Sequence, residues 1–163
     1  RRLYHRPGHF GLWRDEHDLI MADASQQRPP LAGHWQAGEG TRTGAWTVGD
    51  LWIDWDGHRY ALLVGERHCN ATGMMHGGAM ATFLDGQAFV VVDDTLRQRH
   101  TPTISLSIDF LAPPLPGDWL VAEVQLVKIT RSMIVTQALA KVGERVVARS
   151  NAIYSNTIGK DAP

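Results

Sequence analysis

The sequence predicts an α+β fold in which an antiparallel β-sheet of five or six strands curls around one long central helix. A segment after residue 77 has helical length and is apolar on nearly every face, which indicates burial rather than a surface position. Strand-like segments flank it and are joined by short turns. Helix and strands that are segregated along the chain are typical of α+β proteins.

Two strands are predicted before the helix. Leu51–Trp55 is strand-like, and Asp56-Gly57 is a hairpin signal that leads into a second strand over His58–Arg67.

The helix itself is predicted over Gly77–Arg97. Between Ala79 and Val92 only Thr82, Asp85 and Gln87 can form hydrogen bonds through their side chains. A buried aspartate needs a partner. Asp85 therefore either pairs with a core hydroxyl or basic group, or borders a pocket and acts as a base or nucleophile.

The strands after the helix are better marked. Thr103–Leu111 alternates apolar and polar residues, as a half-buried strand does, and a proline-rich turn ends it. Trp119–Ile129, Ser132–Val142 and Arg145–Tyr154 follow as further strands.

The chain is expected to form one domain over residues 47–158, with an N-terminal extension over 1–46 and a frayed tail over 159–163. The extension is predicted to hold a loose helix near Leu12–Ala22 and a loop.

Composition narrows the function. Sixteen basic against seventeen acidic residues argue against a nucleic-acid partner. The single cysteine, Cys69, allows no intrachain disulfide, and no signal peptide or membrane span is visible, so a cytoplasmic protein without membrane contact is expected. The histidines show no metal-binding spacing, and neither a metal nor another cofactor is predicted.

The helix begins at His76-Gly77-Gly78, where free N–H groups and small residues would suit an anionic oxygen. Asp85 lies nine residues beyond His76, roughly 13.5 Å along a helix. One reacting carbon cannot contact both groups in one chain. If both act on it, the site lies between two subunits.

The pattern Asn70, Gly73, His76-Gly77-Gly78 and Asp85 resembles the signature of the phenylacetate-pathway (PaaI-like) thioesterases of the hotdog superfamily. The resemblance covers about residues 50–155. It implies a homodimer or dimer of dimers that hydrolyses an acyl-CoA to free acid and CoA.

The resemblance also implies a role for each matching residue. The Gly77 N–H polarises the thioester carbonyl, with Gly78 beside it in contact with substrate, while His76 and Asn70 orient substrate and turn. Asp85 of the partner subunit is the general base or nucleophile, and Thr103 helps to hold the attacking water. Thr101 is close enough to compete for that last role.

Other interpretations remain open from the sequence. Arg131, in the turn between two strands, either contacts the CoA phosphates or is ordinary surface charge. Alternative functions are a dehydratase or hydratase of acyl thioesters, and a non-catalytic acyl-CoA-binding or sensing module.

Overall fold

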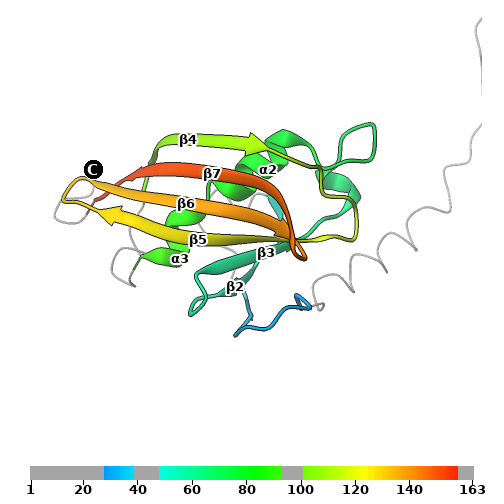
Figure 1. Ribbon diagram of the computed structural model, residues 1–163, viewed down its shortest axis with the longest axis horizontal. Helices are drawn as coiled ribbons and strands as arrows, with labels where there is room; N and C mark the ends of the chain where they lie inside the picture. The colour runs from blue at the N-terminus through cyan, green and yellow to red at the C-terminus, as the bar shows by residue number, and fades with distance from the viewer. Residues whose placement is uncertain (1–27, 39–47, 93–100, 158–163) are drawn as a thin grey trace, which may run out of the picture.

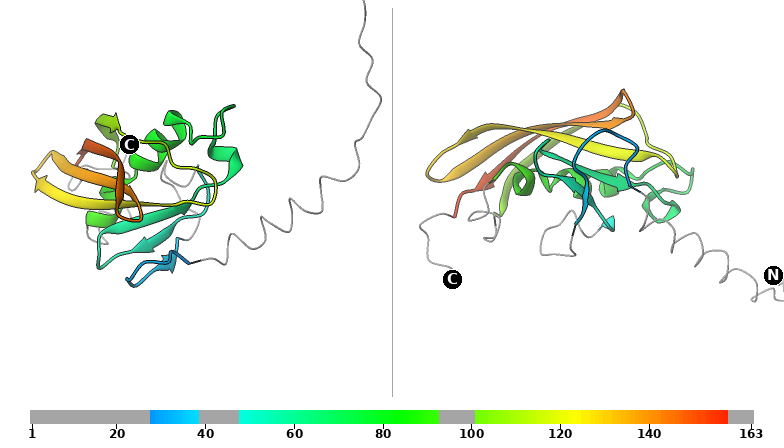
Figure 2. Two further views of the ribbon diagram at one scale, coloured as in Figure 1. Left: turned by 45° about the vertical axis from the view of Figure 1, so that its right-hand side comes forward. Right: turned by 90° about the horizontal axis from the view of Figure 1, so that it is seen from below.

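The computed structural model describes residues 28–38, 48–92 and 101–157. A curled antiparallel sheet lies on one side, and two helical segments fill its concave face (Figures 1 and 2). This arrangement confirms the predicted α+β fold with a central helix inside a curled sheet. In the described part of the chain, no helix is long and apolar enough to cross a membrane.

The sheet has seven strands rather than five or six, in the order β1-β2-β3-β5-β6-β7-β4. In chain order the elements are β1 (Gln36–Ala37), β2 (Trp52–Asp54), β3 (Arg59–Leu63), the 3-10 turn η2 (Glu66–His68), α2 (Gly77–Leu84), α3 (Gln87–Val91), β4 (Thr103–Phe110), β5 (Trp119–Ile129), β6 (Met133–Val142) and β7 (Arg145–Ser155). The additional strand is β1, a two-residue segment that pairs with β2. Strands β1 and β4 form the two edges.

Two predicted elements differ from the observed ones. The second strand was expected to reach Arg67 but ends at Leu63, and η2 takes up the rest of the segment. The predicted helix from Gly77 is present, but it is interrupted at Asp85 and Gly86. Its second part, α3, ends at Val91, where Val92 is already extended, whereas the helix was predicted to continue to Arg97. The predicted helix near Leu12–Ala22 lies outside the described residues.

The core lies between the helices and the inner face of the sheet. Tyr60 on β3 packs against two aromatic rings of the helices, with centroids 4.7 Å from Phe83 and 5.2 Å from Phe89. On β6, every second side chain from Ile134 to Ala140 is buried, which is the alternation that one covered face requires.

Residues 28–38 pack against the opposite, outer face of the sheet. Trp35 is buried against Ala61 and Val121, and Arg59 stacks 5.1 Å above the indole ring. Arg59 also donates a hydrogen bond to the Ala32 carbonyl (2.7 Å) and forms an ion pair with Asp54. This segment therefore covers part of the outer face over β2, β3 and β5.

Candidate active site

The loop before α2 is organised by Asn70. Its side-chain oxygen accepts hydrogen bonds from the Thr72 N–H (2.9 Å), the Thr72 hydroxyl (2.6 Å) and the Met74 N–H (3.3 Å). Gly73 lies within the turn at φ +77°, a conformation that favours glycine. Asn70 thus acts on the shape of the loop that leads into the helix.

His76 is the N-cap of α2. Its Nδ1 accepts a hydrogen bond from the Gly78 N–H (2.8 Å), and its own N–H donates to the His68 carbonyl (2.8 Å). A neutral His76 in this arrangement carries its proton on Nε2, since Nδ1 is the acceptor. The ring lies so close that a Cβ at Gly78 would be 2.9 Å from Nδ1. Gly78 is therefore small because the histidine folds back onto it.

Gly77 is the first residue of α2, and its N–H has no acceptor within the helix. The residue is exposed. A Cβ built there would meet the Phe110 ring at 3.7 Å, an ordinary contact. The Gly78 N–H is already hydrogen-bonded to His76. Of the two glycines, Gly77 is therefore the one whose N–H is accessible to a ligand.

Asp85 ends α2 and lies at the interruption of the helix. Its Oδ1 accepts a hydrogen bond from the Thr103 hydroxyl at 2.8 Å. The aspartate is only partly buried, and Thr103 is exposed on the edge strand. The structure thus brings together Asp85 and Thr103, with the carboxylate facing accessible space rather than the closed core.

The predicted residues form two groups at opposite ends of α2. Gly77 and Asp85 are separated by eight residues, or about 12 Å of helix. Strand β4 runs past both groups: Thr103, at its start, contacts Asp85, and Phe110, at its end, lies beside Gly77. The two groups do not meet within one chain.

Arg131 lies exposed in the turn between β5 and β6. The register pairs Met133 with Ser155 and Thr103 with Tyr154, which places this turn at the same end of the sheet as Thr103 (Figure 1). None of the contacts within the described ranges joins Arg131 to another predicted site residue.

Two buried tyrosines next to Asp85 were not predicted as site residues. The Tyr154 hydroxyl donates to the Asp85 carbonyl and the Tyr60 hydroxyl donates to the Phe83 carbonyl, both at 2.8 Å. Burial, and then the charge of Asp85, raise the pKa of Tyr154. Burial raises the pKa of Tyr60 well above its ordinary value. One feature of the sequence could have pointed to such hydrogen-bond partners. The few polar residues of an otherwise apolar helix need buried donors or acceptors from the strands that pack against it.

Cys69 is partly buried, and its thiol points toward the Gly65 carbonyl, with Sγ 3.6 Å from the oxygen. Burial, and then the charge of Glu66, raise the pKa of this thiol above its ordinary value. A thiol that stays protonated is a poor nucleophile. Cys69 therefore has the properties of a packing residue.

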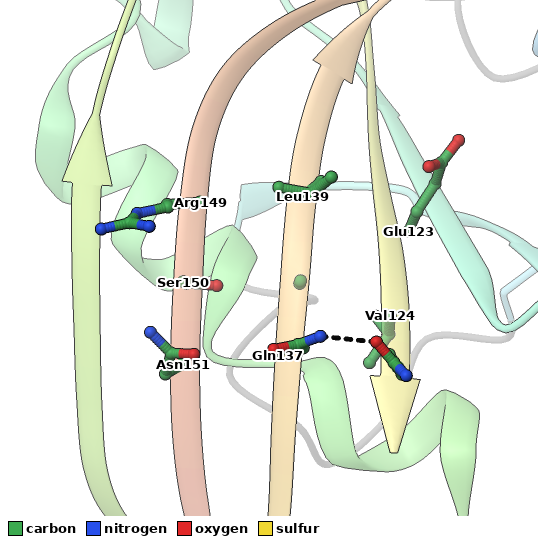
Figure 3. Close-up of a pocket in the computed structure, with 9 residues that line it drawn as sticks. Glu123, Val124, Gln137, Leu139, Arg149, Ser150 and Asn151 are labelled. Carbon is green, nitrogen blue, oxygen red and sulfur yellow. Dashed lines mark hydrogen bonds between the residues drawn. The ribbon is translucent and has the colours of Figure 1, made fainter. Parts of the chain in front are cut away.

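A hollow of about 380 Å³ lies on the outer face of the sheet (Figure 3). It is lined mainly by polar side chains of β5, β6 and β7, including Glu123, Gln137 and Arg149. Gln137 donates to Gln125 across it. This hollow contains none of the predicted site residues and lies on the face of the sheet away from α2.

Comparison with known proteins identifies relatives of this chain. The thioesterase superfamily model matches residues 72–149, which include the helix and most of the strands after it. A candidate esterase of Pseudomonas aeruginosa is 30% identical over 95 residues, which cover 58% of this chain and 71% of that protein.

Several solved structures share the fold. A mutant form of the phenylacetic acid degradation protein PaaI from Thermus thermophilus has 15% identity and a TM-score of 0.55, covering 85% of this chain and 99% of that chain. A hypothetical thioesterase protein from Streptococcus pneumoniae, solved with coenzyme A, has 18% identity and a TM-score of 0.55, covering 75% of this chain and 87% of that chain.

Proposed function

The chain belongs to the thioesterase superfamily, and we propose that it hydrolyses an acyl-CoA to a free acid and CoA. The observation that carries the proposal is the Asp85 carboxylate, which is partly exposed and hydrogen-bonded to the Thr103 hydroxyl. The coenzyme A bound to the Streptococcus pneumoniae relative supports the same class of substrate.

In this proposal Asp85 is the general base. Thr103 donates to Oδ1, which leaves Oδ2 to accept a proton from water. The Thr103 oxygen can also accept a hydrogen bond and so helps to orient that water. The water oxygen attacks the thioester carbon while Asp85 takes its proton. Collapse of the tetrahedral intermediate breaks the C–S bond, and the CoA thiolate leaves and is protonated.

The Gly77 N–H stabilises the oxyanion of that intermediate. It lies at the positive end of α2, and the missing side chain lets the carbonyl oxygen approach the backbone closely. His76 supports this role by holding the Gly78 N–H, which fixes the first turn of the helix.

A second copy of the chain completes the site. Strand β4 is a sheet edge, and Ile104, Phe110 and Leu111 on or next to it are all more than half exposed. Such an edge favours pairing with another strand. A twofold axis makes two copies of β4 antiparallel, so the start of one strand lies beside the end of the other. The Asp85–Thr103 pair of one subunit then faces the Gly77 end of its partner.

Arg131 is proposed to contact the CoA phosphates. Its turn lies at the same end of the sheet as Thr103, and its side chain is exposed. A guanidinium group suits phosphate through paired hydrogen bonds.

The proposal is tested by Asp85→Asn in an assay that measures thiol release from a panel of acyl-CoAs. We expect kcat to fall by about 10² to 10⁴, the range for a lost general base, with the melting temperature unchanged. A single turnover in H₂¹⁸O should put the label in the acid product if water attacks directly. Wild-type turnover by the Asn variant would contradict the role of Asp85, and absence of thiol release by the wild type would contradict the function.

A further inference from the structure

The interruption of the helix at Asp85 is held by side chains rather than by the helical backbone pattern. Three consecutive carbonyls at the end of α2 each accept a side-chain donor. The Tyr60 hydroxyl bonds the Phe83 carbonyl (2.8 Å), and the Tyr154 hydroxyl bonds the Asp85 carbonyl (2.8 Å). Gln87 Nε2 bonds the Leu84 carbonyl (3.0 Å). The end of α2 is therefore fixed at three successive points.

Tyr154 differs from the other two donors because it bridges the interruption. Its oxygen donates to the Asp85 carbonyl and accepts from the Gln87 N–H at 3.2 Å. In an uninterrupted helix the Gln87 N–H would bond the Phe83 carbonyl, four residues earlier. The tyrosine oxygen takes the place of that acceptor, an insertion of the kind that bends helices.

Tyr154 also lies directly opposite Thr103 in the β4–β7 register. Thr103 holds the Asp85 carboxylate, while Tyr154 holds the backbone carbonyl of the same residue. Two facing residues on neighbouring strands therefore fix Asp85 at both ends. A shift of its backbone would move the carboxylate away from the threonine hydroxyl.

The inserted hydroxyl belongs to a rigid setting. Tyr154 is 2% exposed and Gln87 is fully buried. The Gln87 side chain is itself fixed, since Nε2 donates to Ser150 on β7 (2.7 Å) and Oε1 accepts from Thr136 on β6 (2.9 Å). Burial raises the pKa of Tyr154, so its hydroxyl stays protonated and remains a donor at neutral pH.

We propose that Tyr154 is a positioning residue for the reaction: by bridging the Asp85 carbonyl and the Gln87 N–H, it sets the place and direction of the Asp85 carboxylate. Tyr154 does not contact the substrate in this proposal. The inference rests on the proposed function, in which Asp85 activates water.

The test compares Tyr154→Phe with Tyr60→Phe. Each variant removes one buried hydroxyl that bonds a carbonyl at the end of α2 at 2.8 Å, so both should lower the melting temperature. Tyr154→Phe should lower it more, because it also leaves the Gln87 N–H without its acceptor. Only the first acts on Asp85. We expect Tyr154→Phe to lower kcat by about 10²-fold, as for a reacting group displaced by about 1 Å, with little change in KM. Tyr60→Phe should retain kcat near the wild-type value.

Asp85→Asn is measured in the same series. If it is inactive while Tyr154→Phe retains full kcat, the proposed function stands and the positioning role is wrong. If the two tyrosine variants lose kcat equally, the effect follows loss of stability and the positioning role is also wrong. If Asp85→Asn keeps full activity, Asp85 is not the base, and the positioning role of Tyr154 fails with it, while acyl-CoA hydrolysis is still judged by thiol release from the wild type.

Discussion

The two glycines at the start of α2 have different reasons to be glycine. At Gly78 a side chain would collide with the His76 ring, whereas at Gly77 it would only touch Phe110. The first constraint is internal to the fold. Gly77 has room for a methyl group, so packing does not require glycine there, and in the proposed function the reason is the approach of substrate to its N–H.

Alanine at each position should separate these reasons. Gly77→Ala is expected to melt like the wild type but to lower kcat/KM by at least roughly 10-fold. The loss should be smaller than the factor of about 10² to 10³ for a lost oxyanion donor, because the N–H is still present. Gly78→Ala is expected to displace the His76 cap and to destabilise the fold by about 0.5–2 kcal/mol. Thermal melts and acyl-CoA kinetics measure both. Full activity of Gly77→Ala would show that close approach to that N–H is not required.

At the scale of single residues, the sequence points to the candidate base Asp85 but not to the residues that hold it. Asp85 stands out because it is the one charged side chain in an apolar stretch of helix. Tyr154 does not stand out, since a tyrosine near the end of the last strand resembles any core aromatic. Only the strand register shows that it faces Thr103 and reaches the helix backbone.

At the scale of the elements, the turn η2 carries a buried histidine, His68, that contacts the start of the candidate site. His68 is 5% exposed, its Nδ1 accepts from the Gly65 N–H (2.8 Å), and its carbonyl receives the His76 N–H. Burial lowers the pKa of His68 below its ordinary value of 6.5, although its bond to the Val48 carbonyl opposes the shift and the charge of Arg67 adds to it. Protonation of His68 is therefore harder in the folded chain than in the unfolded one.

The lowered pKa of His68 predicts a loss of stability in mild acid. Below pH 6.5 the unfolded chain binds a proton at His68 before the folded chain does, so the free energy of unfolding falls as the pH drops toward the folded pKa. Urea unfolding at about pH 7.5 and about pH 5.5 should show the fall in the wild type. His68→Gln should show a smaller one. The comparison also removes the opposite contribution of exposed His34, whose pKa Asp56 raises by a hydrogen bond. An equal pH dependence of both proteins would contradict the prediction.

Periodicity predicted the existence of the helix but not its interruption. Asp85-Gly86 sits inside an apolar run with no proline, and nothing in the local sequence demands a break there. The cause is tertiary, because buried hydroxyls from β3 and β7 compete for the carbonyls at the end of α2. The strands after the helix were predicted well, and β6 and β7 show the expected alternation of buried and exposed residues. Strand β4, predicted as half-buried, has no buried residue.

For the whole molecule, the central prediction is a site shared by two subunits. A mixture of Gly77→Pro and Asp85→Asn chains, refolded together, should recover about a quarter of the wild-type activity, since half of the dimers are mixed and each has one intact site. Proline is tolerated in the first turn of a helix, so the Gly77 variant should fold.

Each variant refolded alone is the control and should remain inactive. An active monomer in light scattering, or a mixture with no more activity than its components, would show that the shared site is wrong. The sequence could reach this prediction because it depends on a length, the nine positions of helix from His76 to Asp85. The periodicity of the sequence does not place β4 at an edge, because sheet order is set by contacts between distant segments; the family resemblance alone implied that Thr103–Leu111 pairs with its copy across the dimer.

Cys69 has a practical consequence for measuring stability. It is the single cysteine of the 163 residues, and its elevated pKa keeps the folded thiol slow toward alkylating reagents. Unfolding removes the burial, which is the main cause of the raised pKa of this thiol. The protein therefore carries its own chemical label for the unfolded population: the mass added at one position, at increasing denaturant, counts the molecules that have opened.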